Sequence, residues 1–393
     1  MRTPNRTVVV AATGIFLTAF GLAACSSGSG DSDSTPVATA AAGGVNLADV
    51  CPATVVVQTD WNPEADHGHL YELVGPGYTV DANQKTVTGD LVSGGKPTGV
   101  KIEVRAGGPA IGFTQASTQM YTDKDITMGY VSTDEQVQLS DKFPTTAVFA
   151  ENDKSPMMLM WDPATYPDVT DIASLNTALK DSGGVIRYFN GAAYMSYLTG
   201  SGIVDESVTD GSYDGTPANF VAAGGKDAQQ GFATAEPYIY EKEVPAWGKP
   251  VKLETIHDTG FPLYPEAMSV RSGDLEKLTP CLEKLVPVMQ QADVDYITDP
   301  ATTNSLILDL VNQYNNGWVY SQGVADFAVQ QMKDLKIASN GENAYVGDMD
   351  EARVQKIIDV MTPIYTDAGA PPKSGLTAAE LFTNKFLDQT IGF

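Results

Sequence analysis

Aromatic and ionisable side chains gather where the first predicted strand of the sequence ends. Trp61 closely follows a β-branched run over residues 54–59, and ligands of open α/β sheets bind at such strand ends. His67 and Tyr71 come next, four residues apart, so a helix would place both on one face. Aromatic faces stack on flat rings, and a few polar groups bind the ring edge. These residue types would suit the binding of a flat ring.

Further candidates for the same site are polar or aromatic residues beside later predicted strands. Glu236 could accept hydrogen bonds from an exocyclic amine or a ring N–H, and an ionised carboxylate does so strongly. Ser132 begins a predicted helix and could serve a phosphate or carboxylate tail. Tyr188 and Asn190, with Tyr194, flank a strand-to-helix turn and could form another wall of the site.

The same residues have a simpler interpretation without a ligand. Trp61 and Tyr71 would then be core aromatics, and Glu236 would be a solvated loop carboxylate. For Tyr188 and Tyr194 this structural interpretation is the favoured one.

The segment Asp66-His67-Gly68-His69 is a candidate metal site, because two histidines beside a carboxylate can ligate zinc or manganese. Only His257 is left to complete the set, and alternate positions on a helix face different directions. We predict neither a metal site nor a cofactor. The sequence also lacks a P-loop, a Gly-x-Ser-x-Gly motif and a free reactive cysteine pair, so we do not expect an enzyme.

The composition limits the classes of molecule that the protein could bind. The 393 residues suggest two domains or lobes, and a hydrophobic content of 42% is that of a globular chain. The chain has 24 Lys and Arg against 49 Asp and Glu, which gives a net charge of −25. Such a charge argues against nucleic acid as a partner, because basic side chains drive phosphate binding.

The N-terminus has the pattern of a lipoprotein export signal. Arg2 and Arg6 precede an uncharged stretch over residues 8–24, which ends with small residues before Cys25. Cys25 would carry the lipid, and the Ser/Gly/Ala-rich residues 26–44 would form a flexible tether. The alternative is a transmembrane anchor, for which the stretch is at the short limit.

Lipidation of Cys25 would leave Cys51 and Cys281 in a compartment that permits disulfides. We predict that these two cysteines are bridged. The alternative is a pair of buried free thiols.

Strands and helices alternate along the rest of the sequence, which predicts an α/β fold. The predicted strands are residues 54–59, 100–104, 126–131, 146–150, 157–160, 184–188, 227–233 and 267–270. The predicted helices are residues 168–179 and 219–223, and the chain from residue 275 onward is mainly helical.

Three segments resemble a known family. Asp60-Trp61-Asn62-Pro63 and the following His67-Gly68-His69-Leu70-Tyr71 resemble the opening signature of periplasmic binding proteins for thiamine-pyrimidine precursors. That family is related to the riboflavin, nitrate, sulfonate and taurine binders of ABC importers. Residues 227–237 resemble its Asp-Ala-x-x-Gly-Tyr-Trp-x-x-Glu-Pro motif, and residues 258–262 resemble its Gly-x-Pro turn.

The resemblance implies an α/β, two-lobed periplasmic-binding-protein fold of type II, with mostly parallel sheets, two hinge crossovers and C-terminal helices. It implies a monomeric solute receptor, anchored to the outer face of the cell membrane through Cys25, that passes a small-molecule ligand to an ABC permease. The expected organisation is a signal peptide over residues 1–24, a tether over 25–50, a first lobe over 51–152 and 258–393, and a second lobe over 153–257.

Departures from the family pattern bear on the ligand. Glu64 replaces an Asn, His69 displaces a Gly, and Ala233 and Ala235 replace bulky aromatics, which would open one wall of the cleft. Because Glu236 would repel an anion, we expect a neutral or weakly basic aromatic heterocycle, like a thiamine-pyrimidine precursor or a flavin. The alternatives are a binder of nitrate, sulfonate or taurine, and a metal-binding or adhesive surface lipoprotein.

Overall fold

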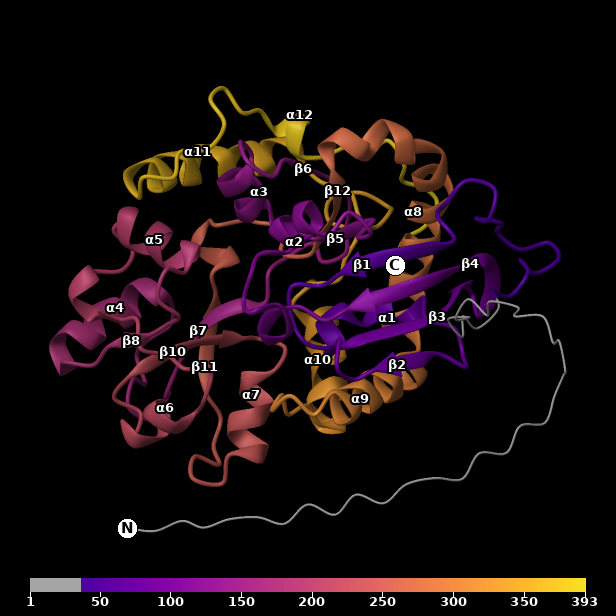
Figure 1. Cartoon of the computed structure of the whole chain (residues 1–393). Coiled ribbons are helices and arrows are strands. Elements are labelled where there is room, and N and C mark those ends of the chain that lie inside the picture. The colour runs from indigo at the N-terminus through magenta and orange to yellow at the C-terminus, as the bar shows by residue number, and fades with distance from the viewer. Residues whose placement is uncertain (1–36) are drawn as a thin grey trace, which may run out of the picture. The chain divides into compact units, whose positions relative to one another are not determined.

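Two β-sheets organise residues 37–393, which are the part of the chain that this computed structural model describes (Figure 1). The first sheet has the strand order β2-β3-β4-β1-β5-β12-β6, and the second has the order β11-β7-β10-β8-β9. The first sheet contains β1 (Thr54–Gln58), β2 (Thr79–Asp81), β3 (Thr86–Ser93), β4 (Lys96–Arg105), β5 (Met128–Tyr130), β6 (Thr145–Ala150) and β12 (Ala267–Arg271). The second contains β7 (Met157–Trp161), β8 (Ile186–Arg187), β9 (Thr209–Asp210), β10 (Ala228–Phe232) and β11 (Lys252–Thr255).

Strand β1 lies inside the first sheet because its side chains are apolar on both faces. Val55, Val56 and Val57 are all buried, as expected for a strand that is covered by helices on both sides. β1 pairs in parallel with β4 and with β5. The strand ends at Gln58, shortly before Pro63, which lacks the N–H that a ladder needs.

The sheets are mixed, which corrects the prediction that they are mostly parallel. β2, β3 and β4 form an antiparallel meander, whose β3–β4 turn contains Gly94 and Gly95 with positive φ. β12 runs antiparallel to both β5 and β6, since the chain returns from the second sheet in the opposite direction. In the second sheet β7 is antiparallel to β10 and β11, and only β8 has parallel partners on both sides.

The chain crosses between the sheets twice. It leaves the first sheet between β6 and β7 and comes back between β11 and β12. The lobe boundaries proposed from the sequence, at residues 152/153 and 257/258, fall within these two connections. A closure between lobes would therefore bend two strand connections, which is the arrangement of a hinge.

The helices form two cores with the two sheets. Between the strands of the first half lie α1 (Gly68–Glu72), α2 (Ala116–Thr122), α3 (Thr133–Leu139), α4 (Ile172–Ser182), α5 (Ala193–Gly200), α6 (Ala218–Ala222) and α7 (Glu236–Tyr238). After β12 come α8 (Leu275–Thr298), α9 (Ala301–Tyr314), α10 (Gln322–Asp334), α11 (Glu351–Asp367) and α12 (Ala378–Leu381). The first core combines first-sheet strands with the apolar faces of α8, α9 and α10.

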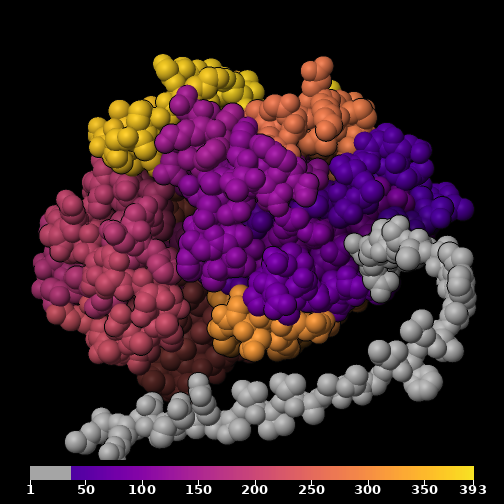
Figure 2. All heavy atoms as spheres, in the orientation of Figure 1, coloured from indigo at the N-terminus to yellow at the C-terminus, as the bar shows by residue number. Residues whose placement is uncertain are grey.

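Helix α11 connects the two parts of the fold. It packs against α3, which follows a first-sheet strand, and against α5, which follows a second-sheet strand. Its buried side chains Ile357, Ile358 and Met361 belong to the same core as Leu159 and Ile186 of the second sheet. In Figure 2 the C-terminal atoms, drawn in yellow, lie against atoms of both regions.

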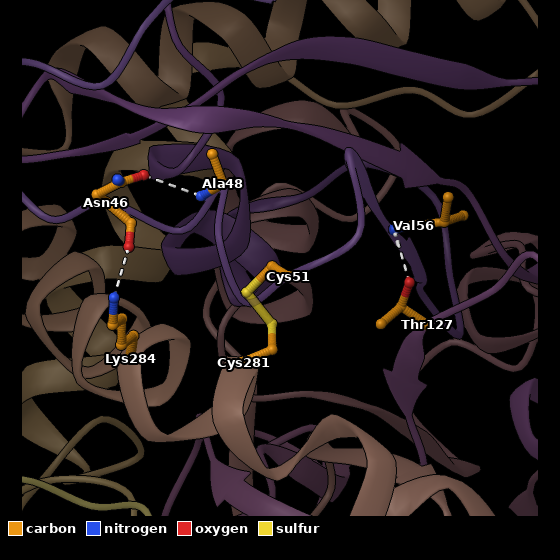
Figure 3. Close-up of a disulfide and its surroundings, with 7 residues drawn as sticks. All are labelled: Asn46, Ala48, Cys51, Val56, Thr127, Cys281 and Lys284. Carbon is orange, nitrogen blue, oxygen red and sulfur yellow. Dashed lines mark hydrogen bonds between the residues drawn. A yellow bond between two sulfur atoms is a disulfide. The ribbon is translucent and has the colours of Figure 1, made fainter.

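The chain packs on the folded body before the boundary predicted at Cys51. Leu47 is fully buried, and its N–H donates to the carbonyl of Thr98 at 2.9 Å. The carbonyl of Asn46 accepts from Nζ of Lys284 at 3.0 Å, as Figure 3 shows. The last residues of the predicted tether therefore pack on the body, because Leu47 is apolar and can be buried there.

Cys51 and Cys281 form a disulfide (Figure 3). It joins the segment before β1 to helix α8, with 4.6 Å between the two Cα atoms. Cys281 itself is buried in the first core. The bridge therefore ties the start of the folded body to a helix 230 residues later in the sequence.

No helix within residues 37–393 is both long and apolar enough to span a membrane. The predicted signal peptide and Cys25 lie outside the described residues.

Candidate functional site

A cavity of about 290 Å³ is lined by residues that lie next to strands of the first sheet, by residues of the second sheet and its helix α5, and by the connections between the sheets. The first-sheet region contributes Asp60, Ser132, Asp134 and Glu266. The second-sheet region contributes Ser155, Met157, Phe189, Ala192, Ala193, Tyr194, Gln230 and Phe232. The returning connection adds Ile256, Phe261, Leu263 and Pro265. A solute in this cavity would contact both lobes at once.

Two close turns hold Asp60 at the edge of the cavity. The turn after β4 packs directly on the turn after β1, and the N–H groups of Gly107 and Gly108 donate to the carbonyls of Trp61 and Asp60, each at 2.8 Å. A Cβ atom on Gly107 would lie 2.3 Å from the carbonyl oxygen of Thr59, so only glycine fits there. This contact fixes the direction of the chain just after β1.

Asp60 pairs with a buried histidine. Nε2 of His67 lies 3.0 Å from Oδ1 of Asp60, and the His67 side chain is 1% exposed whereas that of Asp60 is 46% exposed. Burial alone would lower the pKa of His67, but the hydrogen bond to Asp60 and the charges of Asp60, Glu64 and Glu266 raise it to about 9. The histidine is therefore a cation at neutral pH, and Asp60 is its exposed partner.

Glu266 is the buried carboxyl group of the cavity. It precedes β12, is only 6% exposed and accepts a hydrogen bond of 2.8 Å from Nδ2 of Asn152 through Oε2. Burial raises its pKa, the negative charge of Asp60 raises it further, and the result is about 8. Its second carboxyl oxygen has no hydrogen-bond partner among the described residues. Glu266 can therefore both accept from and donate to a ligand near neutral pH.

Gln230 offers the cavity a hydrogen-bond donor. Its side chain is 2% exposed, and its Oε1 accepts from the N–H of Phe189 at 2.6 Å and from the hydroxyl of Tyr194 at 2.8 Å. These two donors determine which end of the amide is the oxygen. The Nε2 group donates to no described residue, so it is available to a ligand. The neighbouring Gln229 points to the other face of the sheet and donates to Tyr240.

Two phenylalanines of the cavity are unusually exposed. Phe189 is 41% exposed and Phe232 is 38% exposed, and both line the cavity from the second lobe. Phe189 packs against Tyr213, with 4.8 Å between the ring centroids. Exposed apolar rings around a concave surface typically contact a ligand.

The structure places some of the predicted site residues at or beside this cavity. Ser132 lines it, and its hydroxyl donates to Oδ1 of Asp134 at 2.6 Å. His67 does not line it but contacts Asp60, which does. Tyr194, which the sequence also suggested, lines the cavity and orients Gln230.

Other predicted site residues lie elsewhere. Tyr71 is 1% exposed in the first core, because α1 packs its apolar face on α8. Tyr188 packs on the second core, and Asn190 lies against Gly211, because Phe189 between them is the residue that faces the cavity. Trp61 contacts Phe113 and Trp318, with ring centroids 5.9 and 6.1 Å away, and does not line the cavity.

Glu236 supports a wall and does not line the cavity. Its Oε2 accepts from the N–H of Phe232 at 2.6 Å, and burial raises its pKa to about 7. The sequence reasoning missed Asp60, Asp134, Phe189, Gln230, Phe232 and Glu266 as lining residues. Asp60 had a usable signal, since it directly follows the β1 segment. Glu266 and Asp134 had none, because only the fold brings them there.

One donor set near the cavity could hold a metal ion. Asp60, His67 and Glu266 each offer a ligand atom, and these atoms lie within 4.8 Å of one another. This is not the set weighed from the sequence. His69 instead pairs with Glu151 at 2.7 Å and with Asp293 at 3.4 Å. The charged groups near His257 are Arg353, Lys154, Asp258 and Asp153.

A second cavity of about 450 Å³ lies near the start of β1 and is a weaker candidate. Its arginines already have partners, since Arg105 pairs with Glu103 at 2.6 Å and with Asp123 at 2.7 Å, and Arg271 pairs with Asp274. It is lined by residues of the first lobe and of α8 only, so a ligand there would not contact both lobes.

Comparison with known proteins identifies the fold. No protein-family model matches the sequence, and no curated protein is similar to it in sequence. The chain is similar in structure to the periplasmic aliphatic sulphonate binding protein SsuA from Escherichia coli, with a TM-score of 0.52 and 11% identity over 86% of this chain and 94% of that chain. It is also similar to a periplasmic sulfonate-binding protein SsuA from Methylobacillus flagellatus KT, with a TM-score of 0.50 and 13% identity over 86% of this chain and 93% of that one.

These structures confirm the predicted two-lobed periplasmic-binding-protein fold. At such low identity they show the fold and leave the ligand open.

Proposed function

We propose that the protein is a solute-binding receptor of an ABC importer that captures a small aromatic heterocycle between its two lobes. The observation that carries the proposal is the cavity of about 290 Å³, to which the first lobe contributes carboxyl groups and the second lobe contributes two phenylalanines and the oriented amide of Gln230. Small-molecule sites have this composition of apolar walls with few polar groups. The fold supports the proposal, because the structural neighbours are binding proteins of ABC importers.

The mechanism would be closure on the ligand. Asp60 and Glu266 come from one lobe, and Phe189 and Gln230 come from the other. A ligand that touches all four makes its full set of contacts only when the lobes are together, so it shifts the population toward the closed form. The closed form would then dock on a membrane permease. The two strand connections provide the hinge.

The membrane attachment is a separate part of the proposal. Cys25 would carry the lipid, residues after it would form the tether, and the body would work as a monomer on the outer face of the membrane. A spanning helix is not needed for this arrangement, since lipid chains can supply the attachment. Mass spectrometry of the protein from a membrane fraction would show the lipid on a peptide that begins with Cys25.

A small inorganic anion is a poorer ligand for this site. Asp60, Asp134 and Glu266 line the cavity, and none of the described lining residues is Lys, Arg or His. An anion would be repelled by carboxylates without a cation to offset its charge. We propose a receptor without catalytic activity, as the sequence motifs also indicate.

A thermal-shift panel tests the proposed function. It compares 4-aminopyrimidine, riboflavin, taurine, nitrate and Zn²⁺ with the purified protein. A ligand present at 100 times its Kd stabilises the folded state by about 2.7 kcal/mol, which raises the Tm measurably. We expect 4-aminopyrimidine to raise the Tm and nitrate and taurine to leave it unchanged. A shift with nitrate or taurine alone would contradict the proposed ligand class.

A further inference from the structure

We propose that the ligand is an organic cation, a planar group such as an amidinium or a protonated amino-heterocycle, held by the carboxyl groups of Asp60 and Glu266. The inference rests on the proposed function and adds the charge of the ligand to it. Three features of the cavity lead to it: its excess of carboxyl groups, the incomplete hydrogen bonding of Glu266, and the exposed aromatic rings and amide donor of the second lobe.

The first feature is an excess of carboxyl groups. Asp60, Asp134 and Glu266 all line the cavity, and no basic side chain does so within the described chain. Two cations beside it within residues 37–393 already have partners: His67 pairs with Asp60 at 3.0 Å, and Arg353, which donates to the carbonyl of the lining residue Leu263, pairs with Asp153 at 2.6 Å. A positively charged ligand would lower the electrostatic cost of the remaining carboxyl groups, whereas a neutral ligand would leave it in place.

The second feature is the incomplete hydrogen bonding of Glu266. The residue is 6% exposed, yet within residues 37–393 only one of its carboxyl oxygens has a hydrogen-bond partner, which is Asn152. Buried carboxyl oxygens are normally satisfied. A planar cation with two N–H groups could bind Glu266 on one side and Asp60, whose carboxylate is 46% exposed, on the other.

The third feature is the opposite chemistry of the second lobe. Phe189 and Phe232 are 41% and 38% exposed, and their ring faces would attract a cationic ring system. Gln230 presents a free Nε2 donor that would meet a hydrogen-bond acceptor on the ligand. The first lobe would thus bind the positive charge of the ligand. The second lobe would bind its aromatic ring and its hydrogen-bond acceptor.

A bare metal ion fits these features less well. Asp60, His67 and Glu266 offer a donor set, but an ion there would make no use of the phenylalanines or of Gln230. Nδ1 of His67 also has no hydrogen-bond partner among the described residues, whereas metal-bound histidines usually donate through their second nitrogen. An organic cation uses the whole cavity.

A charge series of nearly identical shape tests the inference. Benzamidinium, benzamide and benzoate are planar rings of similar size with charges of plus one, zero and minus one. Calorimetric titration of the purified protein is expected to give a Kd for benzamidinium at least tenfold below that for benzamide, with no binding of benzoate. Equal binding of benzamide, stronger binding of benzoate, or no binding of benzamidinium would overturn the inference.

Isosteric variants assign the effect to the site. Glu266→Gln keeps an acceptor for Asn152 and Asp60→Asn keeps an acceptor for His67, so both are designed to fold. Each should weaken benzamidinium at least fivefold and leave benzamide unchanged. Asp168→Asn is the control, because Asp168 is exposed and lies in the loop before α4. It should change the affinity for neither compound. Equal affinity of all three variants for benzamidinium would place the charge selection elsewhere and contradict the inference.

The outcomes also separate this inference from the proposed function. Binding of a neutral or anionic solute in the thermal panel, without benzamidinium, would overturn the charge inference while the solute-receptor proposal stands. A Kd for Zn²⁺ below about 1 μM, with Zn²⁺ binding lost in Glu266→Gln, would contradict the organic cation and indicate a metal ion as the ligand. If no panel compound raises the Tm and no compound of the charge series binds, both the charge inference and the solute-receptor proposal would be contradicted.

Discussion

The hydroxyl of Thr234 donates a hydrogen bond of 2.8 Å to Oδ2 of Asp66, and both residues are buried. Thr234 follows β10 of the second sheet, and Asp66 lies in the 3₁₀ helix η1 (Ala65–His67) that follows β1 of the first. The bond therefore connects the two lobes directly. His67, the partner of Asp60, is the next residue after Asp66.

Loss of this inter-lobe bond should destabilise the protein. Thr234→Val keeps the shape of the side chain and leaves the buried Asp66 carboxyl without a donor. The free energy of unfolding should fall by about 1–3 kcal/mol, the usual cost of an unsatisfied buried polar group. Urea denaturation measures it. Thr122→Val is the matched control, since Thr122 is exposed and its hydroxyl bonds only within α2. Equal effects of the two variants would contradict a special role for Thr234.

Phe189 and Trp61 should differ in their effect on binding. Phe189→Ala removes a partly exposed wall of the cavity, so the affinity for benzamidinium should fall about tenfold, the cost of roughly 1.4 kcal/mol of aromatic contact. Trp61→Ala removes a ring that contacts Phe113 and Trp318 outside the cavity, so we expect less than a threefold change. Calorimetry of both variants checks this. A larger loss in Trp61→Ala would restore the sequence-based stacking prediction.

The stability should fall as the pH rises from 6 to 9. Folding raises the pKa of Glu266 to about 8, through burial and the charges of Asp60 and Asp66 and against the opposing effects of His67 and Asn152. It raises the pKa of His67 to about 9. The folded state thus binds protons more tightly than the unfolded chain, and this stabilisation is lost as the pH rises through the folded pKa values.

Denaturation at pH 6 and pH 9 measures this loss, and Glu266→Gln should reduce the difference between the two pH values. Asp168→Asn should leave the difference as it is in the wild type. A protein that is more stable at pH 9 than at pH 6 would contradict the assigned burial of Glu266.

Removal of the disulfide should weaken the body without changing the site. The bridge between Cys51 and Cys281 spans 230 residues, and native bridges of this kind contribute about 2–5 kcal/mol to stability. The double variant Cys51→Ser/Cys281→Ser should lose this amount in urea denaturation, while its Kd for benzamidinium stays within twofold. Mass spectrometry without reductant checks the bridge itself. A wild-type protein with two free thiols would contradict this account.

The strands with strong local patterns were predictable from the sequence. Residues 54–59 and 146–150 are apolar and β-branched enough to require burial on two faces, and they form β1 and β6. The meander of β2 and β3 was missed because Thr79–Asp81 and Thr86–Ser93 carry many polar residues and are stabilised mainly by pairing, β2 with β3 and β3 with β4. Strand directions were also mispredicted, since direction depends on tertiary connections and has no local signal.

The candidate site was predictable only in part. Of the residues chosen after β1, His67 contacts the lining residue Asp60, whereas Tyr71 is buried in the core because helix α1 packs on α8. At the second lobe, Tyr188 and Asn190 were chosen, and the structure brings Phe189 between them to the cavity. Strand alternation decides between such neighbours, and a shift of one residue reverses it. Glu266 and Asp134 meet Asp60 only through the fold.

The most direct test of the proposed receptor fills its cavity. Ala193 lines the cavity at the first residue of α5, and Ala193→Phe would occupy the space of the ligand. Ala173→Phe, at an exposed position of α4, is the control. The measurement is the Kd, by calorimetry, of the panel compound that raises the Tm most. The account predicts at least a tenfold loss of affinity in Ala193→Phe and none in Ala173→Phe. An unchanged Kd in Ala193→Phe would show that the ligand binds elsewhere and would contradict the account.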